Sequence, residues 1–106
     1  MKRGEVWSVT LNPTKGSEQR GTRPAVIISP DSMNSSLDTK VIIPLTTKTK
    51  TWPSRINTEF NCEKGQAMCE KIRTISSKRL DKKLGTLSDG ELIEILSTIS
   101  ALYGCP

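Results

Sequence analysis

The sequence predicts an α+β fold, in which a curved antiparallel β-sheet or small barrel is covered by one amphipathic helix. Three observations lead to this prediction. The chain has 106 residues, the size of one domain spanning residues 1–106. Four or more short segments before residue 76 have the apolar pattern of strands. A long segment in which apolar residues recur at helical spacing occurs only at the end of the chain.

The first half of the chain predicts three strands. Residues 5–11 alternate between apolar and polar side chains and predict a half-buried strand. Residues 25–29 and 40–47 contain continuous β-branched runs and predict strands that are covered on both faces. Pro44 has no N–H to donate, so it must lie at an edge or a bulge. A polar loop is expected over residues 30–39 and a basic, turn-prone loop over residues 48–54.

The middle of the chain predicts shorter elements. Residues 56–60 alternate and predict a strand that leads to a turn at Lys64 and Gly65. Residues 66–73 predict another strand. Residues 76–80 predict a single helical turn, and residues 85–87 a short extended piece.

The last element is an amphipathic helix with a clear start. Ser88 and Glu91 have the spacing of a capping box, and Gly104 and Pro106 mark the end of the helix. Apolar side chains recur at helical spacing at Leu92, Ile95, Leu96, Ile99, Leu102 and Tyr103.

The composition excludes several classes of protein. The chain has no histidine, which excludes Ser-His-Asp and Cys-His nucleophile systems and His-ligated metals. The three cysteines follow no C-x-x-C spacing, so we expect reduced thiols with no structural zinc, no disulfide framework and no cofactor. The chain is too polar for a membrane span and its N-terminus has no signal peptide, which predicts a cytoplasmic protein.

The charge distribution favours a polyanionic partner. All 16 lysines and arginines and 8 of the 11 acids lie in residues 1–83, a net charge of +8, while the rest of the chain carries −3. Nucleic acid is the first candidate partner for such a basic body. The chain has only four aromatic residues, so recognition must depend on ionic and hydrogen-bonding groups rather than on a row of stacking rings.

Three polar clusters lie where predicted strands meet loops. They are Gly16–Pro24, Thr46–Thr47 and Glu70–Thr74. Taken singly, each has an ordinary structural explanation: a surface ion pair, good strand formers, or a solvated strand face. Their occurrence together favours a functional site.

At these clusters the sequence resembles the MazF/PemK/Kid family of toxins. The matching residues, in order, are Arg3-Gly4-Glu5-Val6-Trp7, Leu11-Asn12-Pro13-Thr14, Gly16-Ser17-Glu18-Gln19, Gly21, Arg23-Pro24-Ala25-Val26-Ile27-Ile28-Ser29, Pro44-Leu45-Thr46-Thr47, Ile72-Arg73-Thr74-Ile75 and Lys78-Arg79-Leu80. The resemblance implies a CcdB/MazF-like fold on an SH3-like barrel. It also implies a homodimeric, metal-independent, sequence-specific endoribonuclease that cuts single-stranded RNA and is neutralised by a MazE-like antitoxin.

The resemblance assigns Arg23 and Thr46 to the catalytic positions of the family. A guanidinium offers bidentate donors to phosphate oxygens, and a threonine hydroxyl can hydrogen-bond the scissile phosphate or orient the 2′-OH. Because the chain lacks histidine, the base for the 2′-OH must be a carboxylate, Glu18 or Glu70. The other expected RNA contacts are Ser17, Gln19, Arg20, Thr47, Lys48, Lys71 and Arg73.

The sequence departs from the family pattern at four positions. Ser17 stands where some members have His, and Met68 where some have the Arg that is assigned as proton donor. Glu70 replaces the Asp that follows that Arg, and Lys71 stands where a Gln is common. Arg23 or Lys71 can take the donor role. Trp52 is expected either to contact a base or the antitoxin, or to cap the core beside Pro53.

Two other functions are compatible with this fold. One is poisoning of DNA gyrase, as by CcdB, which ends in Trp-Gly-Ile where this chain ends in Tyr103-Gly104-Cys105-Pro106. The other is a non-catalytic, SH3-like nucleic-acid-binding domain that uses the polar clusters only to hold phosphates.

Overall fold

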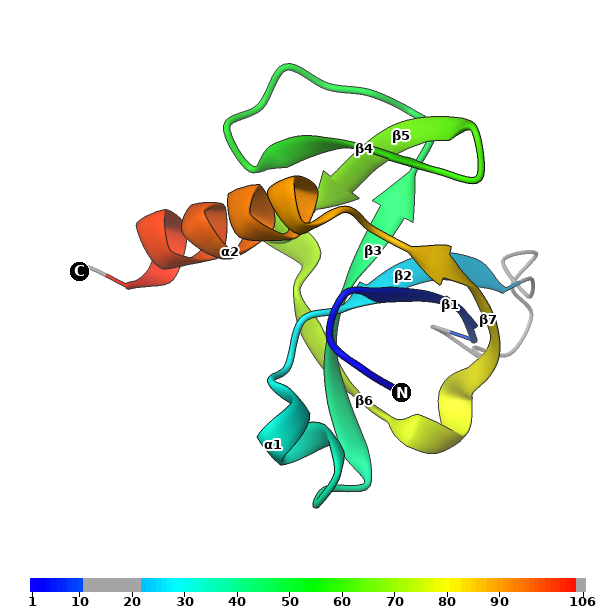
Figure 1. The fold of residues 1–106 in the computed structure, drawn as a ribbon. Coiled ribbons are helices and arrows are strands. Elements are labelled where there is room, and N and C mark those ends of the chain that lie inside the picture. The colour runs from blue at the N-terminus through cyan, green and yellow to red at the C-terminus, as the bar shows by residue number, and fades with distance from the viewer. Residues whose placement is uncertain (11–21, 105–106) are drawn as a thin grey trace, which may run out of the picture.

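A computed structural model describes residues 1–10 and 22–104 and shows a curled antiparallel sheet with a C-terminal helix (Figure 1). The strand order is β4-β5-β3-β2-β1-β7, and β6 also pairs with β3. The strands are β1 (Glu5–Val9), β2 (Arg23–Ile27), β3 (Thr39–Thr46), β4 (Arg55–Phe60), β5 (Glu63–Met68), β6 (Arg73–Ser76) and β7 (Leu80–Thr86). The helices are α1 (Asp31–Asn34) and α2 (Asp89–Tyr103), with 3-10 turns at Cys69–Lys71 and Ser77–Arg79. The fold class predicted from the sequence is therefore confirmed.

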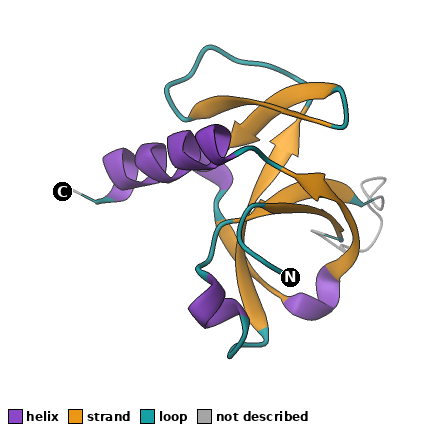
Figure 2. Ribbon diagram, in the orientation of Figure 1, coloured by secondary structure: helices purple, strands orange, loops and turns teal. Residues whose placement is uncertain are grey.

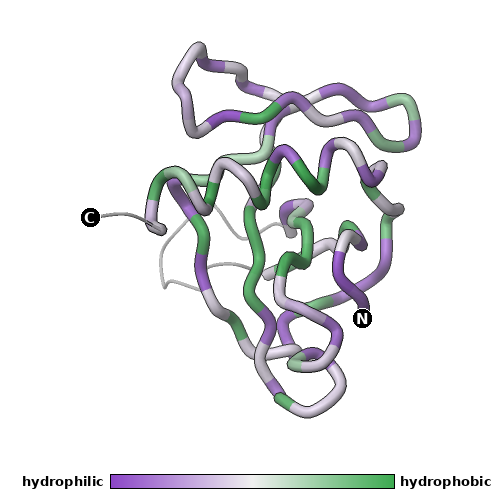
Figure 3. The backbone as a smooth tube through the Cα atoms, turned by 60° about the vertical axis from the view of Figure 1, so that its left-hand side comes forward, coloured by the Kyte–Doolittle hydropathy of each residue, from purple (hydrophilic) through white to green (hydrophobic). Residues whose placement is uncertain are grey.

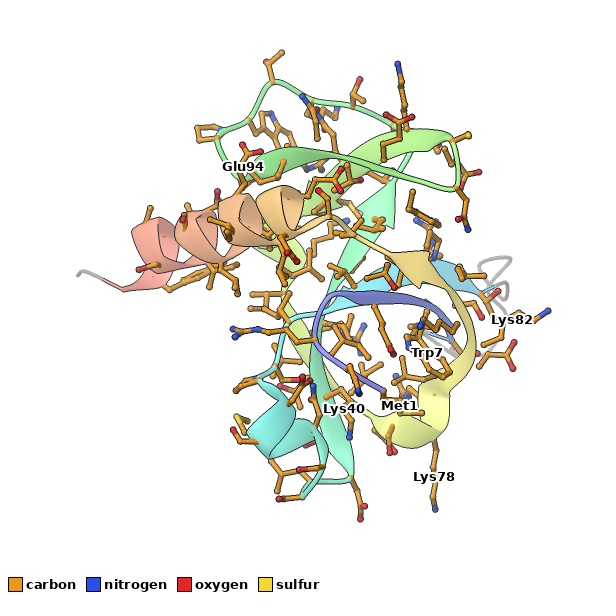
Figure 4. All side chains as sticks on the ribbon, in the orientation of Figure 1. Met1, Trp7, Lys40, Lys78, Lys82 and Glu94 are labelled. Atoms are coloured by element: carbon orange, nitrogen blue, oxygen red, sulfur yellow. The ribbon has the colours of Figure 1, made fainter. Side chains whose placement is uncertain are left out.

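The curl of the sheet creates two apolar clusters. The larger one lies between the sheet and α2 and includes Val26, Ile43 and Ile95. The smaller one is formed around Val9 and Ile27. Trp7 packs against it from within the curl (Figure 4). Strand β1 contributes Val6 to the larger cluster and Val9 to the smaller one, so it is buried on both faces and not on one as its alternation predicted.

Strand β3 joins the two parts of the sheet. Its first half pairs with β6 over residues 39–42, and its end pairs with β5 at Leu45 and Thr46. Pro44 lies at the junction between these two ladders, where the missing N–H does not break either one. The continuous strand predicted over residues 66–73 is wrong. The registers of the two ladders differ by three residues, and the Cys69–Lys71 turn takes up that difference.

The β4–β5 turn lies earlier than the sequence predicted. The turn is formed by Asn61 and Cys62, which have φ angles of 50° and 65°, while Lys64 and Gly65 lie within β5. Asn adopts the left-handed region more readily than most residues, which makes a tight turn possible here without glycine. Gly65 serves another purpose: a Cβ at this position would collide with the backbone carbonyl oxygen of Thr46.

The short helix α1 was not predicted, because residues 30–39 have the composition of a loop. Asn34 holds it against the strand that precedes it, accepting a hydrogen bond from the Ser29 hydroxyl (2.6 Å) and donating one to the Ser29 carbonyl (2.8 Å). Helix α1 lies at the opposite end of the molecule from the β4–β5 hairpin (Figure 2). The helical turn predicted over residues 76–80 is confirmed at Ser77–Arg79.

Helix α2 begins as the sequence predicted. Ser88 and Glu91 form both bonds of the capping box, and Gly104 follows the last helical residue. Apolar residues recur along α2 (Figure 3), and Ile95 is fully buried against the sheet. Glu91 also accepts a hydrogen bond from the backbone N–H of Glu59 on β4 (2.6 Å), which ties the start of the helix to the outermost strand. Within residues 1–10 and 22–104, no helix has the length and apolar character needed to cross a membrane.

Candidate active site

The ends of β2 and β3 bring two predicted site residues together. The antiparallel register pairs Ala25 with Pro44. Continued by two residues to the start of β2 and the end of β3, the same register sets Arg23 opposite Thr46. Arg23 is the first residue of β2 and Thr46 is the last residue of β3. Both side chains therefore lie where the sheet opens to solvent. Arg23 is exposed and Thr46 is partly exposed.

Arg23 and Thr46 line a pocket of about 360 Å³. Its lining comes from β2, from the end of β3 and the loop that follows, and from the β4–β5 hairpin. The lining residues are Arg23, Pro24, Leu45, Thr46, Thr47, Lys48, Thr58, Phe60, Glu63, Lys64 and Gly65. Four of the residues predicted from the sequence thus lie at one site: Arg23, Thr46, Thr47 and Lys48.

The local backbone orients the Thr46 hydroxyl. The Lys48 backbone N–H donates a hydrogen bond to Thr46 Oγ1 (3.1 Å), which occupies one lone pair of this oxygen. Among the described residues nothing accepts the hydroxyl proton, so Thr46 can donate it to a bound ligand. The same bond closes a turn that holds Lys48 at the rim of the pocket.

The pocket suits an anion. Among its described lining residues, Arg23, Lys48 and Lys64 carry positive charge, and Glu63 carries the one negative charge. Guanidinium, ammonium and hydroxyl donors that converge on one space are the groups that bind phosphate oxygens.

Sequence reasoning missed the contribution of the β4–β5 hairpin. Thr58, Phe60, Glu63 and Lys64 line the pocket because β5 pairs with the end of β3, where Gln66 lies opposite Thr46. The signal that would have found them is Asn61: a turn placed there extends β5 back to residue 63 and brings Glu63 and Lys64 towards Thr46.

The third polar cluster lies elsewhere. Glu70 does not line the pocket, and its two oxygens are engaged: Oε1 accepts from the Ser54 hydroxyl (2.7 Å) and Oε2 from Arg55 Nε (2.8 Å). Arg55 Nη2 also lies 2.8 Å from Oε2, and the Arg55 side chain is only 6% exposed. Burial raises the pKa of Glu70, but the bonds from Arg55 and Ser54 outweigh it and hold the pKa below its usual 4.5. Lys71 and Arg73 are exposed and lie outside the pocket lining.

The structure describes only the end of the Gly16–Pro24 cluster. Ser17, Glu18, Gln19 and Arg20 lie outside the described residues, which resume at Thr22. At the other positions that depart from the family pattern, Met68 is buried, and Lys71 is exposed on the Cys69–Lys71 turn.

Trp52 lies on the loop between β3 and β4 and does not cap the core. It is 48% exposed and belongs to neither apolar cluster. The Arg55 guanidinium carbon lies 4.7 Å from the centre of its ring, and Lys50 Nζ lies 5.4 Å from it. The Trp52 ring thus lies at the surface and makes cation–π contacts with Arg55 and Lys50.

The thiols and acids offer no metal centre in the part of the chain that is described. Cys62 is exposed and Cys69 is buried, and both are free; Cys105 lies outside that part. No group of three or more Cys, Asp or Glu side chains within residues 1–10 and 22–104 is arranged to hold a metal ion.

Comparisons with known proteins identify the family. The model of a family described as the PemK-like, MazF-like toxin of type II toxin–antitoxin systems matches residues 2–103. The endoribonuclease MazF of Staphylococcus saprophyticus is 34% identical over 98% of this chain and 92% of its own length. The endoribonuclease toxin MazF of Escherichia coli is also 34% identical, over 95% of this chain and 92% of its own length.

Solved structures agree in fold. The MazE–MazF structure from Deinococcus radiodurans (Form-II) superposes with a TM-score of 0.87, at 22% identity over 100% of this chain and 97% of the matched chain. An endoribonuclease from a mycobacterial species, in complex with its cognate antitoxin, gives a TM-score of 0.85 at 22% identity, over 100% of this chain and 97% of that one. The sequence match and the shared fold together place this chain in the PemK/MazF family of toxins.

Proposed function

We propose that this protein is the toxin of a toxin–antitoxin pair and an endoribonuclease that cuts single-stranded RNA at specific sequences. The observation that carries the proposal is the placement of Arg23 opposite Thr46 in a cationic pocket, in a chain whose relatives are endoribonucleases. This arrangement matches the needs of RNA cleavage by the ribose itself, which requires charge stabilisation at one phosphate and no nucleophile from the protein.

In the proposed reaction the substrate supplies the nucleophile. The ribose 2′-oxygen attacks the adjacent phosphorus and loses its proton to a base, while the bond from phosphorus to the 5′-oxygen breaks and that oxygen gains a proton. The products are a 2′,3′-cyclic phosphate and a 5′-OH. Arg23 binds the non-bridging oxygens as negative charge develops on them, and the Thr46 hydroxyl donates to the same phosphate.

The base is a carboxylate in this proposal, and the structure adds a candidate. Glu70 is a weak choice, because Arg55 and Ser54 engage both of its oxygens and lower its pKa. Glu18 remains from the sequence, and Glu63 lines the pocket. The pH dependence of cleavage by Glu18→Gln, Glu63→Gln and Glu70→Gln distinguishes them. The variant that loses the rise in rate with pH identifies the base, and we expect Glu70→Gln to retain it.

The remaining contacts and partners follow from the family. We propose that Ser17, Gln19, Arg20, Lys71 and Arg73 hold RNA beyond the pocket, and that a MazE-like antitoxin neutralises the toxin, as structures of relatives with an antitoxin suggest. We also propose a homodimer and a cytoplasmic location. Exposed apolar residues at Ile93, Leu102 and Tyr103 give α2 a surface for such an interface.

Two substitutions test the function directly. Arg23→Ala and Thr46→Val should each lower kcat/KM for RNA by 100-fold or more, since each removes a donor to the phosphate. The matched controls are Lys78→Ala, which removes a charge that points into solvent (Figure 4), and Thr39→Val at the exposed start of β3. Cleavage at the parental rate by Arg23→Ala would refute the assignment.

The chemistry is tested with the substrate. A 2′-deoxyribose at the cleaved position should abolish cutting of an RNA that the protein otherwise cuts, because the nucleophile is then missing. Cutting of the deoxy-substituted RNA would exclude attack by the 2′-OH. RNA that stays intact with the wild-type protein would instead favour a gyrase poison or a non-catalytic binding domain.

A further inference from the structure

A second hollow continues the pocket along the hairpin. It has a volume of about 580 Å³ and lies between the loop after β3 and the β4–β5 hairpin. Thr47, Thr58, Lys64 and Gly65 line both hollows, so the two hollows adjoin along the hairpin, and together they are called the groove. The residues found only in the second hollow are Thr49, Asn57, Glu59 and Glu91. RNA whose phosphate lies at Arg23 and Thr46 can thus place a neighbouring base here.

Asn57 lies in register with the catalytic threonine. Gln66 on β5 pairs with Thr46 on one side and with Asn57 on the other. Paired residues in a sheet point to the same face, and neighbouring strands are about 4.8 Å apart, so Asn57 and Thr46 lie about 10 Å from each other in one row. That separation suits a contact with the base of a nucleotide that flanks the cleaved bond.

A chain of hydrogen bonds fixes which end of the Asn57 amide faces the groove. The backbone N–H of Lys50 donates to Gln66 Oε1 (2.9 Å), and Gln66 Nε2 donates to the Lys50 carbonyl (3.0 Å). Gln66 Nε2 also donates to Asn57 Oδ1 (3.1 Å). A backbone N–H only donates and a carbonyl only accepts, so the buried Gln66 amide cannot turn over.

The Asn57 amino group is therefore a hydrogen-bond donor whose direction is fixed. The Asn57 oxygen is held by Gln66, and among the described residues nothing accepts a hydrogen bond from Asn57 Nδ2. Asn57 is exposed, so this amino group is available to a ligand in the groove.

We propose that Asn57 Nδ2 selects the base next to the cleaved bond by donating to a keto oxygen. Guanine O6 and uracil O4 are acceptors, whereas adenine and cytosine present amino groups at the corresponding positions and would set donor against donor. The groove therefore prefers guanine or uracil at this nucleotide. Gln66 acts as a positioning residue. The proposal rests on the endoribonuclease function above.

The test converts the donor into an acceptor. Wild-type protein and Asn57→Asp are incubated with an RNA of random sequence, and the new 5′ ends are sequenced. The wild type should favour guanine or uracil over adenine and cytosine by about tenfold at one position beside the cut, the value of one hydrogen bond. In Asn57→Asp that preference should disappear or reverse. The same base profile in both proteins would overturn the proposal.

The control separates charge from recognition. Thr51→Asp adds the same negative charge to the neighbouring loop at an exposed residue that does not line the groove. It should weaken cleavage of all sequences alike and leave the base profile unchanged. If even the wild type leaves RNA intact, the endoribonuclease function itself fails, which differs from active cutting with an unaltered profile.

Gln66→Glu tests the positioning role. Glutamate can still accept from the Lys50 N–H but cannot donate to Asn57, so the Asn57 amide is free to turn over. The ratio of kcat/KM for substrates with keto and amino bases should fall toward one, while a merely structural role would lower kcat/KM for both substrates equally. An unchanged ratio would remove Gln66 from the proposal.

Discussion

Gly65 sets how closely β5 can approach the end of β3 that carries Thr46. Its backbone runs so near the Thr46 carbonyl oxygen that a methyl group would collide with it. Because the obstacle is backbone rather than a flexible side chain, relief requires the strands to separate. The position of Thr46 in the pocket therefore depends on the absence of a side chain one strand away.

Gly65→Ala should lower the free energy of unfolding by about 1–3 kcal/mol, as overpacking does, and should also lower RNA cleavage. The matched change is Gly90→Ala in the first turn of α2, where a new Cβ meets nothing within 4 Å. This change should be neutral or stabilise the protein by up to about 1 kcal/mol. Denaturant unfolding measures both, and equal effects of the two changes would contradict this explanation.

The two described thiols should differ sharply in reactivity. Burial, and then the neighbouring Glu70 carboxylate, raise the pKa of Cys69 to about 11, so its thiol stays protonated at neutral pH. At pH 7.5 iodoacetamide should modify Cys62 in the folded protein and leave Cys69 unmodified until denaturant is added. Peptide mass spectrometry reads the two sites separately. Equal labelling of both in the folded state would show that Cys69 is not buried.

The loop between β3 and β4 is an ordered element without regular secondary structure. Gln66 holds the loop backbone at Lys50, and Arg55 Nη1 donates to the Lys48 carbonyl (3.3 Å) while the same side chain pairs with Glu70. These bonds come from buried or half-buried side chains of the hairpin and the turn after it. The loop therefore forms one wall of the groove, to which it contributes Thr47 and Thr49.

Acid should weaken this part of the molecule. The pKa of Glu70 is lower in the folded protein than the ordinary 4.5, so its bonds to Arg55 and Ser54 add stability above that pH. This stability is lost as the pH falls through the lowered value. The unfolding free energy of the wild type should fall more steeply below pH 4.5 than that of Glu70→Gln, as measured by urea unfolding at several pH values. Parallel pH profiles would contradict the assignment.

At the level of elements, local signals predicted most of the fold. The capping box at Ser88 and the β-branched runs in β2 and β3 depend on nearby residues, and the structure bears them out. The Cys69–Lys71 turn was missed because it takes up the change of register between the β3–β5 and β3–β6 ladders. Such a long-range requirement leaves no mark on the local pattern.

At the level of the whole molecule, the net charge of +5 should govern the affinity for RNA. Binding of a non-cleavable, 2′-deoxy-substituted RNA releases about 0.7 counterion per phosphate contact. If Arg23, Lys48 and Lys64 each bind one phosphate, log Kd should rise with log salt concentration with a slope of about 2. Lys48→Ala should reduce that slope by about 0.7, while Lys78→Ala should leave it unchanged.

The assembly of the candidate site was predictable only in part. Arg23 and Thr46 were found because the resemblance to the toxin family marked them, and the strand register then brings them together. Glu63, Lys64 and Asn57 were not, because their part in the groove depends on the hairpin register, which Asn61 and Cys62 set by adopting positive φ angles. Glu70 is near these residues in sequence, but it accepts hydrogen bonds from Ser54 and Arg55 and does not line the groove.

The bond from Glu91 to the Glu59 amide also bears on the solubility of the toxin. Strand β4 is the last strand of the sheet, and an unpaired last strand is the usual place for foreign chains to add on and start aggregates. A chain that added at Glu59 would have to displace the Glu91 carboxylate, which is also the cap of α2. Growth at this edge would therefore also cost α2 the bond from the Ser88 N–H to Glu91, which opposes such addition.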